Sequence, residues 1–123
     1  MTIRGKAFIA GVFEHPARLI PDRGVAQVHA EVALGALADA GLSANDVDAY
    51  FCDGGAGFGP VSMVEYLGLD PRRVDSTETG GSSYLLHVGH AAEAIAAGRC
   101  HVALITMAGL PRCWQLRMAR RKS

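Results

Sequence analysis

The chain alternates short apolar stretches with segments of helical length or spacing, and this order constrains its fold more than any other feature. The apolar stretches are 7–12, 47–52, 73–77 and 101–107, and the helical segments are 25–40, 61–67 and 82–97. Short apolar runs between turn residues suit buried strands, and strands that alternate with helices favour a mainly parallel sheet. The sequence therefore predicts an α/β fold in the order βαβαβαβ, with helices covering the sheet.

Local signals mark the ends of the expected helices. The first helix carries apolar residues near a period of 3.6, at Val25, Val28, Val32, Leu34 and Leu37. Gly41 can adopt the left-handed conformation that ends it, and Leu42 can pack back on its last turn. Ser43, followed by Asp46 three residues later, predicts a capped single turn. Pro71 follows the second helix, and Gly98 is expected to end the third.

Composition limits the class of protein. The chain has 123 residues, of which 50% are hydrophobic and 20% charged, which suits one domain with a buried core. No apolar run reaches the roughly 18 residues of a membrane span, and no signal-peptide pattern follows Met1. Three scattered cysteines are typical of reduced intracellular thiols. We therefore expect a cytoplasmic protein rather than a disulfide scaffold or a membrane protein.

Charge is unevenly distributed along the chain. Residues 1–111 hold 7 basic and 12 acidic residues, a net charge of −5, whereas residues 112–123 hold five basic residues and no acidic one. The acidic body would repel a phosphate backbone, so no nucleic-acid partner is expected, and five basic residues are weak evidence for membrane contact. We interpret 112–123 as a solvated basic tail outside the fold.

A glycine-rich loop, 53–60, follows the second apolar stretch and invites comparison with dinucleotide-binding loops. That fingerprint requires G-x-G-x-x-G at the start of a helix. The sequence from Gly55 to Pro60 places proline where the third glycine belongs, and the following helical segment is short. A loop that bends over a neighbouring element is the favoured interpretation.

Residues 80–84, Gly-Gly-Ser-Ser-Tyr, resemble the nucleophile elbow G-x-S-x-G of hydrolases. Tyr84 occupies the place of the closing glycine, and the chain order serine, acid, histidine allows only Glu93 and His101 as partners. A small serine hydrolase acting through Ser82 stays a minor alternative. Serines at a helix start more commonly cap exposed N–H groups.

Histidines and cysteines offer few metal ligands. His87 and His90 lie three residues apart and can share a helix face, but a zinc site usually takes three or four protein ligands. We expect the two histidines to pack or to cap, and we predict no metal site. Cys52 and Cys100 lie at strand edges without basic neighbours in sequence, so buried, unreactive thiols are expected.

Three separated segments resemble the thiolase superfamily. Residues 79–84, running into 91–105, resemble the segment in which a glycine-flanked turn opens a buried helix. Residues 28–43 with 47–48 resemble the first helix and the strand after it. Residues 65–77 resemble the sterol-carrier-type branch. The resemblance covers roughly residues 3–111 and implies a thiolase-like βαβαβαβ half-domain, the amino-terminal half of an acetyl-CoA acetyltransferase-like protein.

The resemblance implies acyl-CoA chemistry, namely thiolysis or Claisen-type carbon–carbon bond formation in lipid or sterol side-chain metabolism. A cysteine at a buried helix N-terminus is the nucleophile of that family, because exposed N–H groups lower its pKa. Gly81 matches its position here, with Ser82 and Ser83 beside it. The substrate implied is a coenzyme A thioester, and no bound cofactor is expected.

The chain also differs from the family in its length. The chain covers most of one of two similar halves, and by resemblance the activating histidine, the second cysteine and most coenzyme A contacts lie in the other half. From Cys113 onward the sequence stops resembling the family, as a truncated or out-of-frame end would. We therefore expect a domain that is catalytically inactive alone. We also expect it to form a homodimer. The alternative is a non-catalytic subunit that pairs with a full-length thiolase-like chain.

Overall fold

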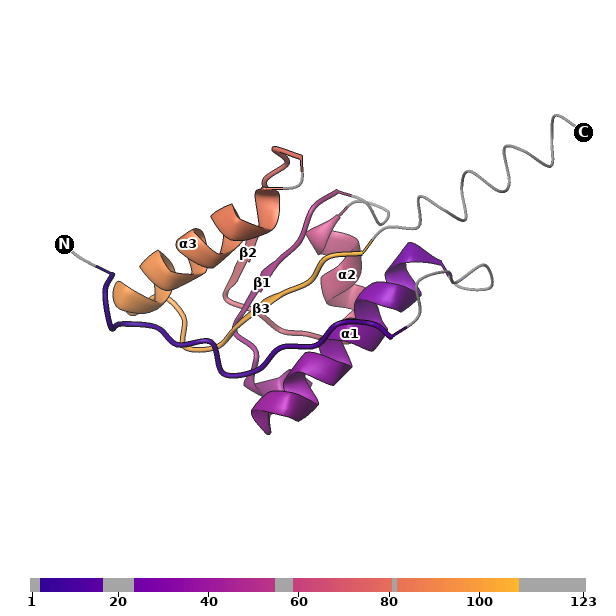
Figure 1. The fold of residues 1–123 in the computed structure, drawn as a ribbon, viewed down its shortest axis with the longest axis horizontal. Helices are drawn as coiled ribbons and strands as arrows, with labels where there is room; N and C mark the ends of the chain where they lie inside the picture. The colour runs from indigo at the N-terminus through magenta and orange to yellow at the C-terminus, as the bar shows by residue number, and fades with distance from the viewer. Residues whose placement is uncertain (1–2, 17–23, 55–58, 81, 109–123) are drawn as a thin grey trace, which may run out of the picture.

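A computed structural model of the chain describes residues 3–16, 24–54, 59–80 and 82–108 (Figure 1). Its elements alternate along the chain as the sequence predicts, except at the N-terminus. In order they are α1 (Val25–Ala40), a 3-10 turn (Ala44–Asp46), β1 (Ala49–Phe51), α2 (Pro60–Leu67), β2 (Arg73–Asp75), α3 (Ser83–Ala96) and β3 (Ala103–Ile105).

Helix ends follow the local signals in the sequence. Gly41 ends α1 in the left-handed conformation, with φ of 72°, and the Leu42 N–H donates to the Leu37 carbonyl. The Ser43 N–H donates to the Asp46 carboxylate at 2.8 Å, which completes the predicted capping box. These caps satisfy backbone groups that a helix end otherwise leaves unpaired.

The three strands form one parallel sheet in the order β2-β1-β3. Tyr50 at the centre of β1 lies opposite Val74 on one side and Leu104 on the other. Successive side chains of β1 point to opposite faces, and all three of its residues are fully buried. A strand buried on both faces is typically a continuous apolar run, as residues 49–52 are.

Asp48 holds the starting ends of the three strands together. Its carboxylate accepts hydrogen bonds from the backbone N–H groups of His101 and Val102, each at 2.8 Å. Its own carbonyl accepts the N–H of Arg72 at 2.8 Å. One side chain and one peptide unit therefore tie β1 to both of its neighbours just before pairing begins.

Two separate hydrophobic clusters cover the two faces of the sheet. Helices α1 and α2 pack on one face and α3 packs alone on the other (Figure 1). The α1/α2 cluster consists of Ala33, Leu37, Val47, Tyr50, Cys52, Met63, Leu69 and Leu104. The α3 cluster consists of Ala49, Phe51, Ala91, Ala94 and Cys100. The α3 cluster is built from smaller side chains, with Phe51 as its only large member.

The prediction of a buried strand at 7–12 was wrong. No strand forms there, and Phe8, Ile9 and Val12 are 85%, 78% and 68% exposed. The segment lies instead on α1, where the Val12 N–H donates to the Asp39 carboxylate and Gly11 approaches the α1 backbone so closely that no Cβ would fit. An apolar run becomes a strand only where a neighbouring backbone offers hydrogen bonds, and none does here within the described residues.

The prediction that Leu34 lies on the inward face of the first helix was also wrong. Leu34 is 62% exposed, whereas His29 is fully buried on the inward face of α1. The predicted apolar positions Val28 and Leu37 are buried as expected. The inward face thus follows 28, 29, 33 and 37, a stripe in which a polar ring replaces an aliphatic side chain.

Several sequence predictions fall on residues outside the described part of the chain. These are the middle of the glycine-rich loop (55–58), the nucleophile position Gly81, Cys113, and the basic tail at 112–123. Within the described ranges, no helix is both long enough and apolar enough to cross a membrane.

Candidate functional site

Polar residues gather where the three parallel strands end. Parallel strands present their carboxyl ends at one edge of a sheet, which is where α/β proteins commonly bind ligands. Asp53 follows β1, Thr77 follows β2 and Thr106 follows β3, while α3 begins nearby with Ser82 and Ser83. This edge is the candidate functional site.

Ser83 holds the turn that starts α3. Its hydroxyl donates to the Gly80 carbonyl at 2.8 Å and accepts the Thr79 N–H at 2.8 Å. Gly80 adopts a φ of 77°, which only glycine reaches without strain, and the side chain of Ser83 is buried. Both hydrogen-bonding functions of the hydroxyl are therefore used in shaping the turn before α3. The expected capping of helix N–H groups does not occur, because the N-cap residue Ser82 makes no side-chain cap hydrogen bond.

Ser82 is exposed, and within the described residues its hydroxyl hydrogen-bonds to Thr79 alone. It lies 3.3 Å from the Thr79 carbonyl and 3.4 Å from the Thr79 hydroxyl. No histidine contacts either serine within the described residues. Glu93 lies 11 residues further along α3, about 16 Å at the helical rise per residue. The acid that a hydrolase would need is therefore not brought to Ser82.

Two hydrogen bonds tie the loop after β1 to the start of α3. The Tyr84 hydroxyl donates to the Asp53 carboxylate at 2.6 Å, and the Gly54 N–H donates to Glu78 at 2.7 Å. Burial and the neighbouring Asp53 carboxylate both raise the pKa of the Tyr84 phenol. The described start of the loop thus contacts a neighbouring element, as predicted, although no sequence pattern indicated a contact between Asp53 and Tyr84.

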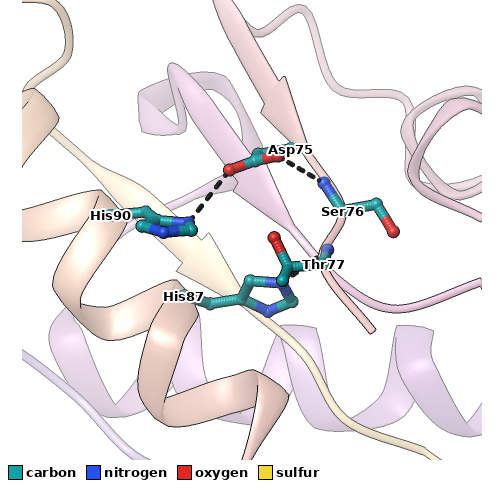
Figure 2. Close-up of polar contacts among 5 residues, drawn as sticks. All are labelled: Asp75, Ser76, Thr77, His87 and His90. Carbon is teal, nitrogen blue, oxygen red and sulfur yellow. Dashed lines mark hydrogen bonds and ion pairs between the residues drawn. The ribbon is translucent and has the colours of Figure 1, made fainter. Parts of the chain in front are cut away.

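His87 is fully buried one turn into α3, where it faces the end of β2 (Figure 2). Its Nε2 accepts the Thr77 backbone N–H at 3.1 Å, so the proton of the neutral ring is on Nδ1, which has no partner in the described chain. The rings of Phe51 and Tyr84 pack against it, with centroids 5.9 and 5.7 Å away. Burial lowers the pKa of His87.

His90 lies one turn further along α3 and pairs with β2. Its Nδ1 is 3.2 Å from one oxygen of Asp75, and the other oxygen of Asp75 accepts the Ser76 N–H at 2.8 Å (Figure 2). Both histidines thus pack and hydrogen-bond, as the sequence predicts. No group of three or more potential metal ligands occurs among the described residues.

A buried polar chain that the sequence did not predict crosses the α1 face. The hydroxyl of Thr106 lies 2.8 Å from His29 Nδ1 and 2.5 Å from the Tyr50 hydroxyl. His29 Nε2 is buried without a partner in the described residues, and burial lowers the pKa of this ring and raises that of Tyr50. The sequence offered one signal for the burial of His29, namely its position next to Val28 on the inward face of the helix.

The described cysteines are structural. Cys52 and Cys100 are both fully buried and free. Burial raises the pKa of Cys52 to about 11 and also raises that of Cys100, so both remain thiols at neutral pH. The prediction of unreactive cysteines at these two positions agrees with this geometry.

The geometry defines an α/β protein with a parallel three-stranded sheet between helices, and its neighbours among solved structures are thiolase-like. One is a monomeric SCP2-thiolase-like protein type 1 from Mycobacterium smegmatis, with a TM-score of 0.66 and 27% identity over 79% of this chain. Another is an Ltp2-ChsH2(DUF35) aldolase, with a TM-score of 0.62 and 27% identity over 68% of this chain. The predicted fold class is confirmed, and so is the likeness to thiolases.

The chain spans 22% of the length of each of these two neighbouring chains. No family model matches the sequence. No curated protein matches it either.

Proposed function

We propose that this chain is a thiolase-like half-domain that takes part in acyl-CoA chemistry but does not transfer acyl groups by itself. The observation that supports the proposal most directly is the start of α3. Ser83 uses its hydroxyl within the turn, and no histidine among the described residues hydrogen-bonds to Ser82. A serine hydroxyl without a base is a poor nucleophile.

By resemblance, we propose that Gly81 occupies the position of the family nucleophile, and glycine has no side chain to acylate. A thiolase-type reaction proceeds through a covalent acyl-enzyme, so a glycine at that position removes the group that would form it. Both described cysteines are buried thiols with raised pKa values and offer no substitute. Thiolysis or Claisen-type bond formation on a coenzyme A thioester, in lipid or sterol metabolism, would then require groups from outside this chain.

A partner chain is the second candidate role, and the outer face of α3 favours it. Leu85, Leu86 and Val88 on this helix are 76%, 41% and 43% exposed, although their helix covers its face of the sheet alone. A cluster of exposed apolar side chains commonly marks a surface that another chain covers. We propose a thiolase-like chain as the occupant, with a second copy of this chain as the alternative.

Mass spectrometry of the intact protein tests the catalytic part of the proposal. The purified chain is incubated with acetyl-CoA, and we expect no mass increase corresponding to an acetyl group. The Gly81→Cys variant is the informative companion, because a thiol placed there can be acetylated if the position lies at a substrate-binding helix start. Acetylation of the unaltered chain, lost in Ser82→Ala, would contradict the proposal.

Light scattering tests the partner surface. We expect the chain to associate with itself or with a co-expressed thiolase-like chain, and Leu85→Ser with Val88→Ser to abolish the association. Leu34→Ser is the matched control, because Leu34 is similarly exposed but lies on α1. A monodisperse monomer that binds no such chain would overturn the partner role.

A further inference from the structure

A polar cavity lies between the edge strand β2 and the second half of α3, apart from the serines at the helix start. Its volume is about 310 Å³. It is lined by Arg73, Asp75, His90, Glu93, Ala94 and Arg99, with Ala97 beside them. Because β2 alternates its side chains, Arg73 and Asp75 project on the same face of the sheet, toward α3. The acyl-CoA role proposed above does not involve these residues.

The two arginines of this cavity, Arg73 and Arg99, have no ion-pair partner among the described residues. Asp75 is already satisfied, since one oxygen meets His90 and the other accepts a backbone N–H. Arg73 and Arg99 form no ion pair within the described chain, and the Nε of Arg73 is buried without any hydrogen-bond acceptor there. A buried donor left unpaired costs free energy, so an Arg in this state indicates an acceptor supplied by a ligand.

A guanidinium group matches the oxygens of phosphate and carboxylate groups with parallel N–H donors. Two such side chains, one from the strand and one from the residues just after α3, form the wall of the same cavity. Glu93, which shares the cavity, has no ion pair in the described residues, and a carboxylate accepts hydrogen bonds but donates none. A fully ionised anion would therefore be repelled on the Glu93 side.

We propose that this cavity binds a phosphate group that carries one proton, with Arg73 and Arg99 donating to its ionised oxygens and Glu93 accepting its P–OH. The arginines attract an anion, whereas Glu93 would repel one. The proton on the phosphate removes this conflict, because the P–OH can donate to Glu93. The same arrangement rejects sulfate, which has the shape of phosphate but no proton to donate. The small side chains of Ala94 and Ala97 leave room beside the phosphate for the organic part of a phosphate monoester.

Binding is measured on the full chain by isothermal titration and by amide chemical shifts, at about pH 6, where a phosphate monoester is partly protonated. The probes are inorganic phosphate, phenyl phosphate and sulfate. We expect saturable binding of phosphate or its ester, and binding of sulfate at least about tenfold weaker. Tighter binding of phenyl phosphate than of inorganic phosphate indicates a monoester as the ligand, and the reverse order indicates free phosphate.

Variants separate this site from general attraction of anions. Arg73→Gln and Arg99→Gln should each weaken phosphate binding about tenfold or more, whereas Arg72→Gln, an exposed neighbour outside the cavity, should not. Glu93→Gln should reduce the difference in affinity between phosphate and sulfate. Because Arg99 is exposed, its variant reports on binding even if Arg73→Gln fails to fold.

Three results would overturn the assignment. One is the absence of saturable phosphate binding, another is an equal loss in Arg72→Gln, and the third is sulfate binding as tightly as phosphate in the unaltered chain. None of these results bears on acyl transfer, since the cavity lies away from the start of α3.

Discussion

The two faces of the sheet are stabilised in different ways. On the α1/α2 face, two helices contribute large side chains around Tyr50 and Met63, and the buried His29 is held by another side chain, Thr106. On the α3 face, a single helix packs through alanines against Phe51, and the buried His87 is held by a backbone N–H. The first face depends on the identity of several side chains, and the second depends on one ring and on the path of the backbone.

This difference bears on where function can arise. Small residues let α3 lie close to the sheet, and they leave its far side and its second half free to contact something else. The α1/α2 face has the larger buried cluster, although Leu34, Val61 and Tyr66 on its helices are exposed. The proposed partner surface and the proposed phosphate site both belong to α3, the helix with the smaller share of the core.

The largest effect should come from Phe51→Ala. Removing the one large side chain of the α3 cluster should lower the free energy of unfolding by about 3–5 kcal/mol, because the surrounding alanines cannot close the cavity. Urea unfolding followed by circular dichroism measures this change. Leu85→Ala, on the exposed side of the same helix, should cost less than about 0.5 kcal/mol. A small loss in Phe51→Ala would show that α3 does not depend on this ring.

Thr106→Val should have the next largest effect, about 2 kcal/mol or more. The substitution keeps the shape of the side chain but leaves both His29 and Tyr50 without their buried partner. Thr77→Val is the matched change on the other face and should be nearly neutral, since His87 is bound to the Thr77 backbone. Equal losses in the two variants, measured by thermal unfolding, would contradict the distinction between the faces.

Stability should depend on pH through both buried histidines. Their pKa values lie below the ordinary 6.5 in the folded state, so protons bind preferentially to the unfolded chain. Stability is therefore complete above about pH 7 and falls as the pH drops below 6.5, by up to about 1.4 kcal/mol per pH unit for each histidine.

Thermal unfolding between about pH 7.5 and pH 5 checks the direction and the size of this dependence. His29→Gln and His87→Gln should each reduce the slope. A stability that rises as the pH falls would refute the assignment of neutral buried rings.

Tyr84→Phe should produce the smallest of these effects, about 1 kcal/mol. It removes one partly buried hydrogen bond, between the start of α3 and the Asp53 carboxylate. Hydrogen exchange should show faster opening of the first turn of α3 and little change in α1. A uniform increase across both helices would mean that this contact supports the whole domain rather than one helix start.

Local signals in the sequence were sufficient for the helices. The predicted range 25–40 is the range observed for α1, because its cap involves Gly41 and Leu42, residues adjacent to the helix end. The turn before α3 is also local, since the partners of Ser83 lie three and four residues away, but the capping of helix N–H groups expected there does not occur. Information of this kind is contained in a short window and needs no tertiary structure.

Features that depend on distant partners were not predictable in the same way. The segment 7–12 has strand composition, but whether it pairs depends on a neighbouring backbone. His29 meets Thr106 across 77 positions, and Asp53 meets Tyr84 across 31. The cavity beside β2 combines residues from a strand, a helix and the segment after it. Only the folded chain brings these groups together.

Asp48 has a consequence for the order of events during synthesis. Its carboxylate accepts a hydrogen bond from a backbone N–H group 54 positions later in the chain. The alignment of β3 with β1 therefore cannot occur until nearly all the described residues have left the ribosome. Until then β1 has one open side. Because pairing over such a separation is slow, the nascent chain passes through a period in which its central strand can meet foreign strands. The same aspartate that aligns the finished sheet therefore acts last.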